Sequence, residues 1–203
     1  SSFRRILAPR PRSGLVCLGV TWPMPSPTDS PALSDFARLA EMFCNFIETE
    51  VDGGAHDEAL HDLHVLLARL YLGALLLPDA FSLLGDEEAR SDPPIARPPE
   101  RYAAVMMRIS PMFGERNYYR EVFDPYAPET EGEGMGSIAD DIADIYGHMR
   151  DGLDFWSAGA LGNALFEWRF NFEIHWAEHA SGALRALFAR SAWYDLGWPR
   201  KTE

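Results

Sequence analysis

Two histidines near the end of the chain are the first candidates for chemistry. His175 and His179 are four residues apart, so on a helix their imidazoles occupy neighbouring positions of one face. A histidine pair at this spacing can bind zinc or another transition metal. Glu178 nearby in sequence, and Asp144 and His148 on the preceding predicted helix, could complete the set. The candidate ligands of a divalent metal are therefore His175, His179, Glu178, Asp144 and His148.

The alternative is that the two histidines lie at the edge of the core and bond to carboxylates. Asp141, Asp144 and His148 share one side of the preceding predicted helix and could supply such partners. The repeated Glu-x-x-His pattern of metal sites in helix bundles is absent from the sequence. Because the spacing fixes no third or fourth ligand, the sequence favours this structural interpretation over the metal site.

Arg169 and Glu173 form a second charged candidate. They are four residues apart and fall between two apolar sides of their predicted helix. Two charges in such a place are costly unless they are paired. We expect them to bond to each other or to polar groups on the facing helix. The functional alternative is a buried polar pocket that grips a small polar ligand.

Other kinds of chemistry have less support. Cys44 follows Phe43 on an apolar helix with no base nearby, which predicts a buried small hydrophobe and not a nucleophile. No Gly-x-Ser-x-Gly, P-loop or dinucleotide-binding motif is present. Aromatic side chains at helical spacing could line a ligand site, but they are more typical of a core. These are Phe166, Trp168, Phe170, Phe172 and Trp176, with Tyr118 and Tyr119 upstream.

The elements that must position these residues are predicted from apolar residues at helical spacing. Long helices are predicted over 35–51, 56–77, 138–156 and 160–189, with shorter helical pieces over 98–109 and 115–123. Ser34 and Ser137 are the predicted N-caps of the first and third long helices. Residues 124–136 are predicted to form a loop. Because no strand pattern of convincing length is found, the predicted class is all-α: a bundle of four long helices plus one or two short ones.

The last long helix is predicted to be central in the bundle because it is apolar on two sides. One side holds Leu161, Leu165, Trp168, Phe172, Trp176 and Ala183, and the other holds Phe166, Phe170, Ile174, Leu184 and Phe188. Only a narrow strip is clearly polar, with Glu167, Asn171, Glu178 and Arg185. The helix over 56–77 is also expected to be covered on more than one side, because Leu66 and Leu76 widen its apolar stripe.

Composition excludes several classes of protein. The 203 residues hold 31 acidic and 18 basic side chains, and a formal charge of -13 makes nucleic acid a poor partner. Two cysteines cannot build a disulfide scaffold. The most apolar stretch, Val65–Leu77, is interrupted by Arg69 and followed by Pro78, so no membrane span is predicted.

The charge is not evenly spread. Residues 1–23 hold four arginines and no acid, and the first acidic residue is Asp29. The abrupt change of sign predicts that Met24 is the true first residue and that the upstream part is a mistaken gene start; the alternative is a targeting segment. Residues 1–32 are therefore interpreted as a disordered or mis-annotated extension, and residues 33–203 as a single helical domain.

Three segments carry a resemblance to a known family. They are YYREVFDP at 118–125, ADDIADIY at 139–146 and EWRFNFEIHW at 167–176. They resemble a bacterial family of small helical proteins classed as a domain of unknown function, over about residues 33–189. The resemblance implies an all-helical, bacterial, cytoplasmic domain, and it transfers no activity, cofactor or catalytic residue.

The sequence leaves two hypotheses for function. The leading one is a non-enzymatic helical module that binds a protein partner or a second copy of itself, with no nucleic acid, no membrane and no cofactor. It rests on a complete core, an acidic surface and the lack of a catalytic constellation. The alternative is a metal-binding helix bundle with hydrolase or redox activity, in which His175 and His179 act with nearby carboxylates.

Overall fold

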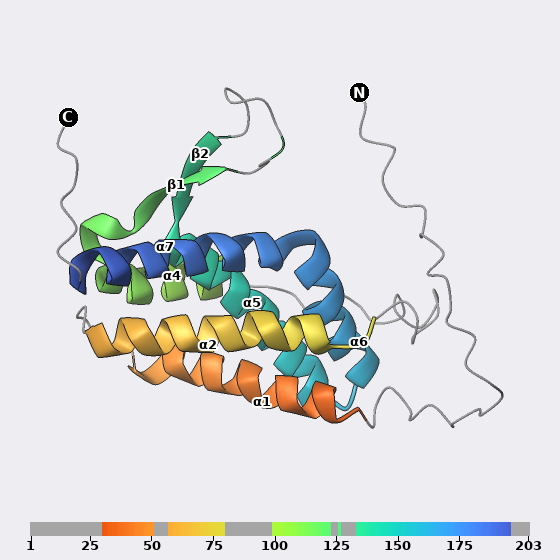
Figure 1. The fold of residues 1–203 in the computed structure, drawn as a ribbon. Coiled ribbons are helices and arrows are strands. Elements are labelled where there is room, and N and C mark those ends of the chain that lie inside the picture. Colours follow the sequence, from red (N-terminus) through yellow and green to blue (C-terminus); the bar gives the residue numbers. More distant parts are fainter. Residues whose placement is uncertain (1–29, 51–56, 80–98, 123–125, 127–132, 196–203) are drawn as a thin grey trace, which may run out of the picture.

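The computed structural model describes residues 30–50, 57–79, 99–122, 126 and 133–195, which form a helical bundle with one small hairpin (Figure 1). The α-helices are α1 (Pro31–Asn45), α2 (Asp57–Leu76), α4 (Pro99–Phe113), α5 (Ile138–Ser157), α6 (Leu161–Leu165) and α7 (Ala177–Asp195). Strands β1 (Tyr118–Val122) and β2 (Glu133–Ser137) pair antiparallel. The predicted all-α class is confirmed, with this hairpin as the one addition in the described part of the chain.

The first helix begins earlier than the sequence analysis predicted. Pro31 occupies the first turn of α1, where a proline sacrifices no hydrogen bond. Ser34 is therefore inside the helix, its hydroxyl donating to the Pro31 carbonyl at 3.0 Å, and the prediction of Ser34 as N-cap is wrong. Helix α1 thus begins at Pro31, before residue 33, where the domain is predicted to start. The predicted start at Met24 lies outside the described residues.

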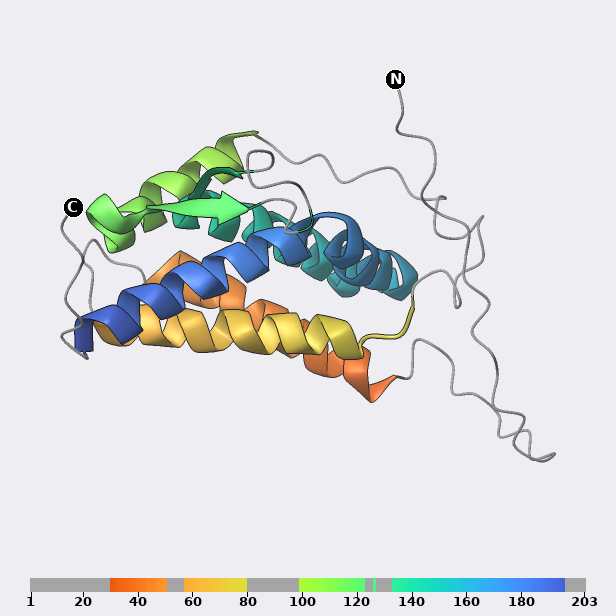
Figure 2. The same ribbon diagram turned by 45° about the horizontal axis from the view of Figure 1, so that its top comes forward.

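Helix α5 occupies the middle of the bundle. It contacts α1, α4, α6 and α7, whereas α1 and α2 lie side by side and α7 packs across both α2 and α5 (Figures 1 and 2). The largest side chains that are fully buried among these helices are Trp168, Trp176, Phe36, Phe43 and Phe113. Cys44 is buried beside Phe43, as predicted.

The last helical region is fully covered on only one of its two apolar sides. The side of Trp168, Phe172 and Trp176 is buried against the core. On the other side Ile174 and Phe188 are each 60% exposed. Phe166, Phe170 and Leu184 of this second side are partly buried against the core, so the last helical region is covered fully on its first side and partly on its second.

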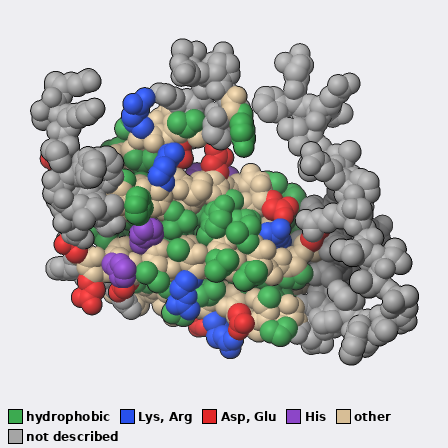
Figure 3. All heavy atoms as spheres, in the orientation of Figure 1, with side chains coloured by type: hydrophobic (Ala, Val, Ile, Leu, Met, Phe, Trp, Pro, Cys, Tyr) green, Lys and Arg blue, Asp and Glu red, His purple; other side chains and the backbone are tan. Residues whose placement is uncertain are grey.

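Helix α2 likewise buries one stripe and exposes another. Its buried residues are those of the predicted stripe, Leu60, Leu63, Leu67, Leu70 and Ala74. Leu66 is partly buried against the core, whereas Val65, Leu72, Leu75 and Leu76 are exposed, so the expected wider coverage of α2 is found at Leu66 and not at Leu76. Figure 3 shows hydrophobic side chains gathered over α2 and the neighbouring α7 on this face.

By length and composition α2 could also cross a membrane, the one helix among the described residues that could. This is weak support for a membrane span, because core helices of bundles pass the same test. The buried stripe of α2 packs on α1 and α7, and 33% of its apolar window is buried.

The hairpin replaces a segment predicted as helix. Residues 118–122 form β1 instead of continuing the predicted helical piece over 115–123, and residues 133–137 of the predicted loop form β2. Burial alternates along β1, with Tyr119 partly buried and Glu121 buried between exposed neighbours. A strand places residues two apart on one face, so Tyr119 and Glu121 point together toward α5 and α7.

The start of α5 is fixed by two polar residues. Ser137 is its N-cap, and the Ser137 hydroxyl accepts from the Asp140 backbone N–H at 3.3 Å, as the sequence predicted. Asn117, just before β1, accepts from the Ala139 N–H at 2.9 Å and donates its amide to the Ser137 hydroxyl at 3.0 Å. Asn117 therefore ties the hairpin to the first turn of α5.

Candidate metal centre

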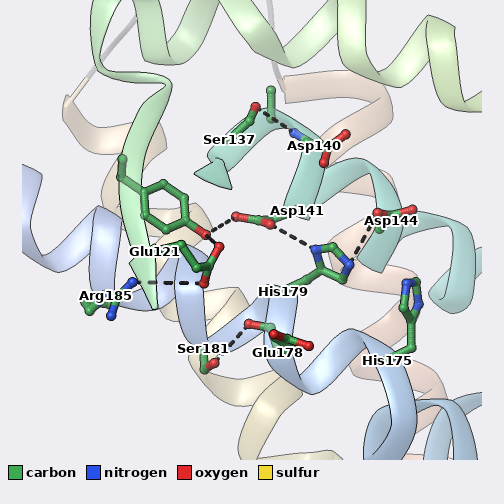
Figure 4. Close-up of polar contacts among 12 residues, drawn as sticks. Glu121, Ser137, Asp140, Asp141, Asp144, His175, Glu178, His179, Ser181 and Arg185 are labelled. Carbon is green, nitrogen blue, oxygen red and sulfur yellow. Dashed lines mark hydrogen bonds and ion pairs between the residues drawn. The ribbon is translucent and has the colours of Figure 1, made fainter. Parts of the chain in front are cut away.

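The candidate ligands meet where α5 passes the last helical region. Asp141, Asp144 and His148 are three and four residues apart on α5, so they share one face. His175 and His179 face them from the π-helical segment Phe172–Trp176 and from α7. Figure 4 shows the two aspartates directed at His179, with His175 beside them.

His179 lies between two carboxylates of α5. Its Nδ1 is 2.9 Å from Asp141 Oδ1, and its Nε2 is 3.5 Å from Asp144 Oδ2. A carboxylate only accepts, so Nδ1–H donates to Asp141, and a neutral His179 then carries its lone pair on Nε2. Asp141 in turn accepts from the Tyr119 hydroxyl at 2.7 Å.

His175 has a similar arrangement with a longer chain of partners. His148 Nδ1 is 2.8 Å from Glu167 Oε1, so His148 donates there and a neutral His148 accepts at Nε2. His175 Nδ1 lies 2.8 Å from that Nε2 and therefore donates to it. In this network the lone pair of His175, like that of His179, is on Nε2.

Three of the five predicted ligands converge. Asp144, His175 and His179 offer ligand atoms that all lie within 4.8 Å of one another. Tetrahedral zinc at about 2.1 Å from each ligand would need them roughly 3.4 Å apart, so small side-chain rotations separate this arrangement from a bound one. His148 lies behind His175 as its hydrogen-bond partner. Glu178 is exposed and is drawn on the side of His179 away from Asp144 (Figure 4).

The backbone around the site departs from α-helix. Phe166–Phe170 and Phe172–Trp176 are both π-helical, and such segments are frequent at functional sites. Each extra residue in a turn rotates the downstream part of the helix by roughly 100°. Glu167, predicted to lie on the polar strip, is the second residue of the first segment and lies against His148 with a side chain that is 13% exposed.

The electrostatics of the site favour a cation. The hydrogen bond to Asp141 raises the pKa of His179 above its usual value, and the charge of Asp144 adds to this effect. Burial raises the pKa of the Asp141 carboxyl, although the hydrogen bonds from His179 and Tyr119 oppose the change. Both directions mean that His179 and Asp141 hold a proton more tightly than the same groups do in water, and a metal ion on His179 would compete with the proton of that imidazole.

Arg169 and Glu173 lie away from this centre and are paired. Arg169 Nη2 is 2.6 Å from Glu173 Oε1, and Nη1 donates to the Ala74 carbonyl of α2 at 3.0 Å. The guanidinium also lies 5.9 Å from the Phe172 ring centre. The predicted pairing with each other and with the facing helix is confirmed. Glu173 is half exposed, so the carboxylate of the pair reaches the surface, and a ligand pocket at this place stays a prediction.

The sequence analysis names Tyr119 only as an aromatic that lines a core or a ligand site, on a predicted helix, and it places Glu167 on a polar strip. It gives neither residue a role beside the histidines. The signal that could have found Tyr119 is the short alternation of large and charged residues in YYREV, which is weak over five positions. No sequence signal marks the π-helical segment that contains Glu167.

Comparisons with known proteins support the fold. A family model described as "Domain of unknown function (DUF5063)" matches residues 28–192. The chain is similar to protein BF1032 from Bacteroides fragilis, a crystal structure with 22% sequence identity and a TM-score of 0.63 that covers 83% of this chain and 99% of that one. No curated protein matches the chain. At this identity the likeness shows a shared fold.

Proposed function

Because the chain belongs to the DUF5063 family of domains of unknown function, we propose a function from the site itself: the protein binds a divalent transition-metal ion. The ligands are His175 Nε2, His179 Nε2 and the Asp144 carboxylate. Two imidazoles and one carboxylate with further positions open suit zinc, iron or manganese. This was the alternative hypothesis of the sequence analysis, and the convergence of three of its candidate ligands supports it.

One observation carries the proposal. His179 Nε2 and an Asp144 oxygen face each other at 3.5 Å, and the tautomer of neutral His179 puts a lone pair on that nitrogen. Two acceptors at this distance need a positive charge between them, either a proton on the imidazole or a metal ion. The second nitrogen of each ligand histidine is already held, by Asp141 and by His148, as is usual for metal-bound histidines.

The arrangement suits a reactive site more than a purely structural one. Structural zinc sites use four protein ligands, whereas catalytic ones keep a position for water or substrate. His175 is exposed, so solvent reaches this imidazole. A bound metal would lower the pKa of a coordinated water and so support metal-assisted hydrolysis. The chain's own residues orient the two imidazoles and exclude solvent on the Asp141 side.

Metal titration of the purified, chelator-treated protein tests the proposal. We expect Zn²⁺, Mn²⁺ or Fe²⁺ to bind one ion per chain and to raise the thermal midpoint, because a ligand that binds only the folded state stabilises it. His179→Ala should abolish the effect. Glu178→Ala is the matched control, since it removes an adjacent carboxylate outside the ligand set. Absence of binding by all three metals would rule the proposal out.

A second candidate function is self-association through α2. Val65, Leu72, Leu75 and Leu76 are exposed at helical spacing on one face. In a two-fold contact the same patch faces itself, so this apolar stripe is complementary to a second copy. The net charge of -13 opposes such contact, so we expect association to strengthen with added salt. Sedimentation of wild type and Leu72→Glu decides it, and a salt-independent monomer would contradict it.

Location and remaining partners belong to the same proposal. A bacterial cytoplasmic location is what the family resemblance implies, and it agrees with a buried thiol at Cys44. Nucleic acid remains a poor partner for a chain of this charge. Cell fractionation with an antibody to the chain tests the location.

A further inference from the structure

We propose that Tyr119 of the hairpin is a positioning residue of the metal centre, which acts through Asp141 to fix the tautomer and orientation of His179. The effect of Tyr119 on metal affinity rests on the proposed function. Its effect on the tautomer of His179 can be measured without a metal and does not. Nothing in the ligand spacing points to the hairpin, because β1 supplies no ligand.

The contacts form a continuous path. The Tyr119 hydroxyl donates to Asp141 Oδ2 at 2.7 Å, and Asp141 Oδ1 accepts from His179 Nδ1 at 2.9 Å. Asp141 is 3% exposed, so water does not readily replace the phenol. With one partner on each oxygen, the carboxylate cannot turn without breaking a hydrogen bond in a buried place. It therefore holds the proton of His179 on Nδ1 and leaves Nε2 for the metal.

The phenol is held by a slot lined with two glycines. Gly136 of β2 pairs with Tyr119 in the hairpin, and Gly182 lies on α7. A Cβ on Gly136 would lie 2.4 Å from Tyr119 Cζ, and one on Gly182 would lie 2.3 Å from the Tyr119 hydroxyl oxygen. Both distances are far below contact, so the ring fits only because these two positions lack a side chain. The slot fixes the hydroxyl relative to α7, which also carries His179.

Glu121 supports the same ring from the strand. Its Oε2 lies 3.0 Å from the Tyr119 hydroxyl, and its Oε1 lies 4.0 Å from Arg185 Nη2. Arg185 also donates to the Arg120 carbonyl at 3.1 Å. These contacts hold β1 against α7. The Tyr119 hydroxyl lies nearer to Asp141, at 2.7 Å, than to Glu121, at 3.0 Å, so we assign its proton to Asp141.

Two variants disturb the hydroxyl by different routes. Tyr119→Phe removes it and keeps the ring in the slot, so the fold is retained. Gly182→Ala keeps the hydroxyl but displaces it, because the new methyl group would overlap it and the end of a side chain moves more easily than a helix backbone. The matched control is Tyr118→Phe, which removes the hydroxyl of the neighbouring tyrosine, 66% exposed. We expect the first two to weaken Zn²⁺ binding about tenfold to a hundredfold, and the control to leave it unchanged.

The tautomer of His179 gives a readout that a merely structural role would not move. In ¹⁵N-correlated NMR spectra of the metal-free protein at pH 8, we expect wild type and Tyr118→Phe to show His179 protonated on Nδ1. Tyr119→Phe should show a mixture of tautomers in a protein that keeps its fold, with a thermal midpoint lowered by the loss of one buried hydrogen bond. If Tyr119→Phe keeps both the wild-type tautomer and the wild-type zinc affinity, the proposal is wrong. If wild type binds no metal, the proposed function fails, and the tautomer comparison still decides the role of Tyr119.

Discussion

Replacing either of two glycines of α5 by alanine should change the free energy of unfolding in opposite directions. Gly147 and Gly152 both lie inside this helix, five residues apart. A Cβ on Gly147 would have no heavy atom within 4 Å beyond its own helix and chain neighbours. A Cβ on Gly152 would lie 2.0 Å from Trp168 Nε1 and 2.4 Å from Trp168 Cε2.

The magnitudes can be worked out from these distances. Alanine is favoured over glycine inside a helix by about 1 kcal/mol, so Gly147→Ala should stabilise the protein by roughly that amount. At Gly152 the same gain is opposed by a clash, because carbon contacts normally lie at about 3.5–4.0 Å. The indole would have to move by well over an ångström, and Trp168 is fully buried. Overpacking of this kind costs about 1–3 kcal/mol, and expelling a tryptophan costs about 3–5 kcal/mol. Gly152→Ala should therefore destabilise by about 2 kcal/mol.

Urea denaturation followed by far-ultraviolet circular dichroism measures both changes. An unchanged slope with a shifted midpoint attributes the effect to stability. A third variant, Trp168→Phe, provides a smaller ring, so its combination with Gly152→Ala should be less damaging than the sum of the two, by about 1 kcal/mol or more. If Gly152→Ala is as stable as Gly147→Ala, the described packing of Trp168 against α5 is wrong. The placement of Glu167, the residue before Trp168, would then need revision too.

Three further predictions concern polar groups. Asn117→Ala should destabilise the protein by about 1–3 kcal/mol in the same denaturation assay, because it removes a buried amide that bonds to the start of α5. Asp141→Asn should lower the pKa of His179, measured by NMR titration, because the hydrogen bond to this carboxylate is the main cause that raises it. Burial and carboxylate partners raise the pKa values of Tyr102 and Tyr146, so the folded state holds these protons more tightly than the unfolded state. The two phenols therefore stabilise the folded state below about pH 10, and this contribution should be lost as the pH rises further. Denaturation at pH 9 and 11 measures the loss of stability, which should be smaller in Tyr146→Phe than in wild type.

The sequence was sufficient where structure depends on local spacing. The buried stripe of α2 and the capped start of α5 result from apolar periodicity and from one serine, and both were predicted from residues that are near each other in the chain. The pairing of Arg169 with Glu173 was predictable for the same reason, since four residues on a helix set their distance. His175 and His179 were found by that rule as well.

Features that depend on distant parts of the chain were not predictable. Residues 118–122 have no long alternation to mark a strand, and they form one because β2, Asn117 and the glycine slot hold them. Exposure of Val65, Leu72 and Leu76 depends on how many elements cover α2, and helix periodicity does not contain that information. The sequence could name Asp144 and His148 as partners of the two histidines. It could not show that Asp144 converges with them, whereas His148 lies behind His175 as its hydrogen-bond partner.

The site contains residues that local spacing predicts and residues that only contacts between distant parts of the chain bring together. The ligands of the proposed metal come from adjacent turns of two neighbouring helices, so spacing alone brings them into view. The groups that orient the ligands come from elsewhere: Tyr119 reaches His179 through Asp141 from the hairpin, and Glu167 reaches His175 through His148 from a π-helical turn. Hydrogen-bond partners behind metal ligands change affinity by about tenfold to a hundredfold. The affinity of this site should therefore depend on the hairpin and the π-helical turns, so variants there test the proposed function without touching a ligand.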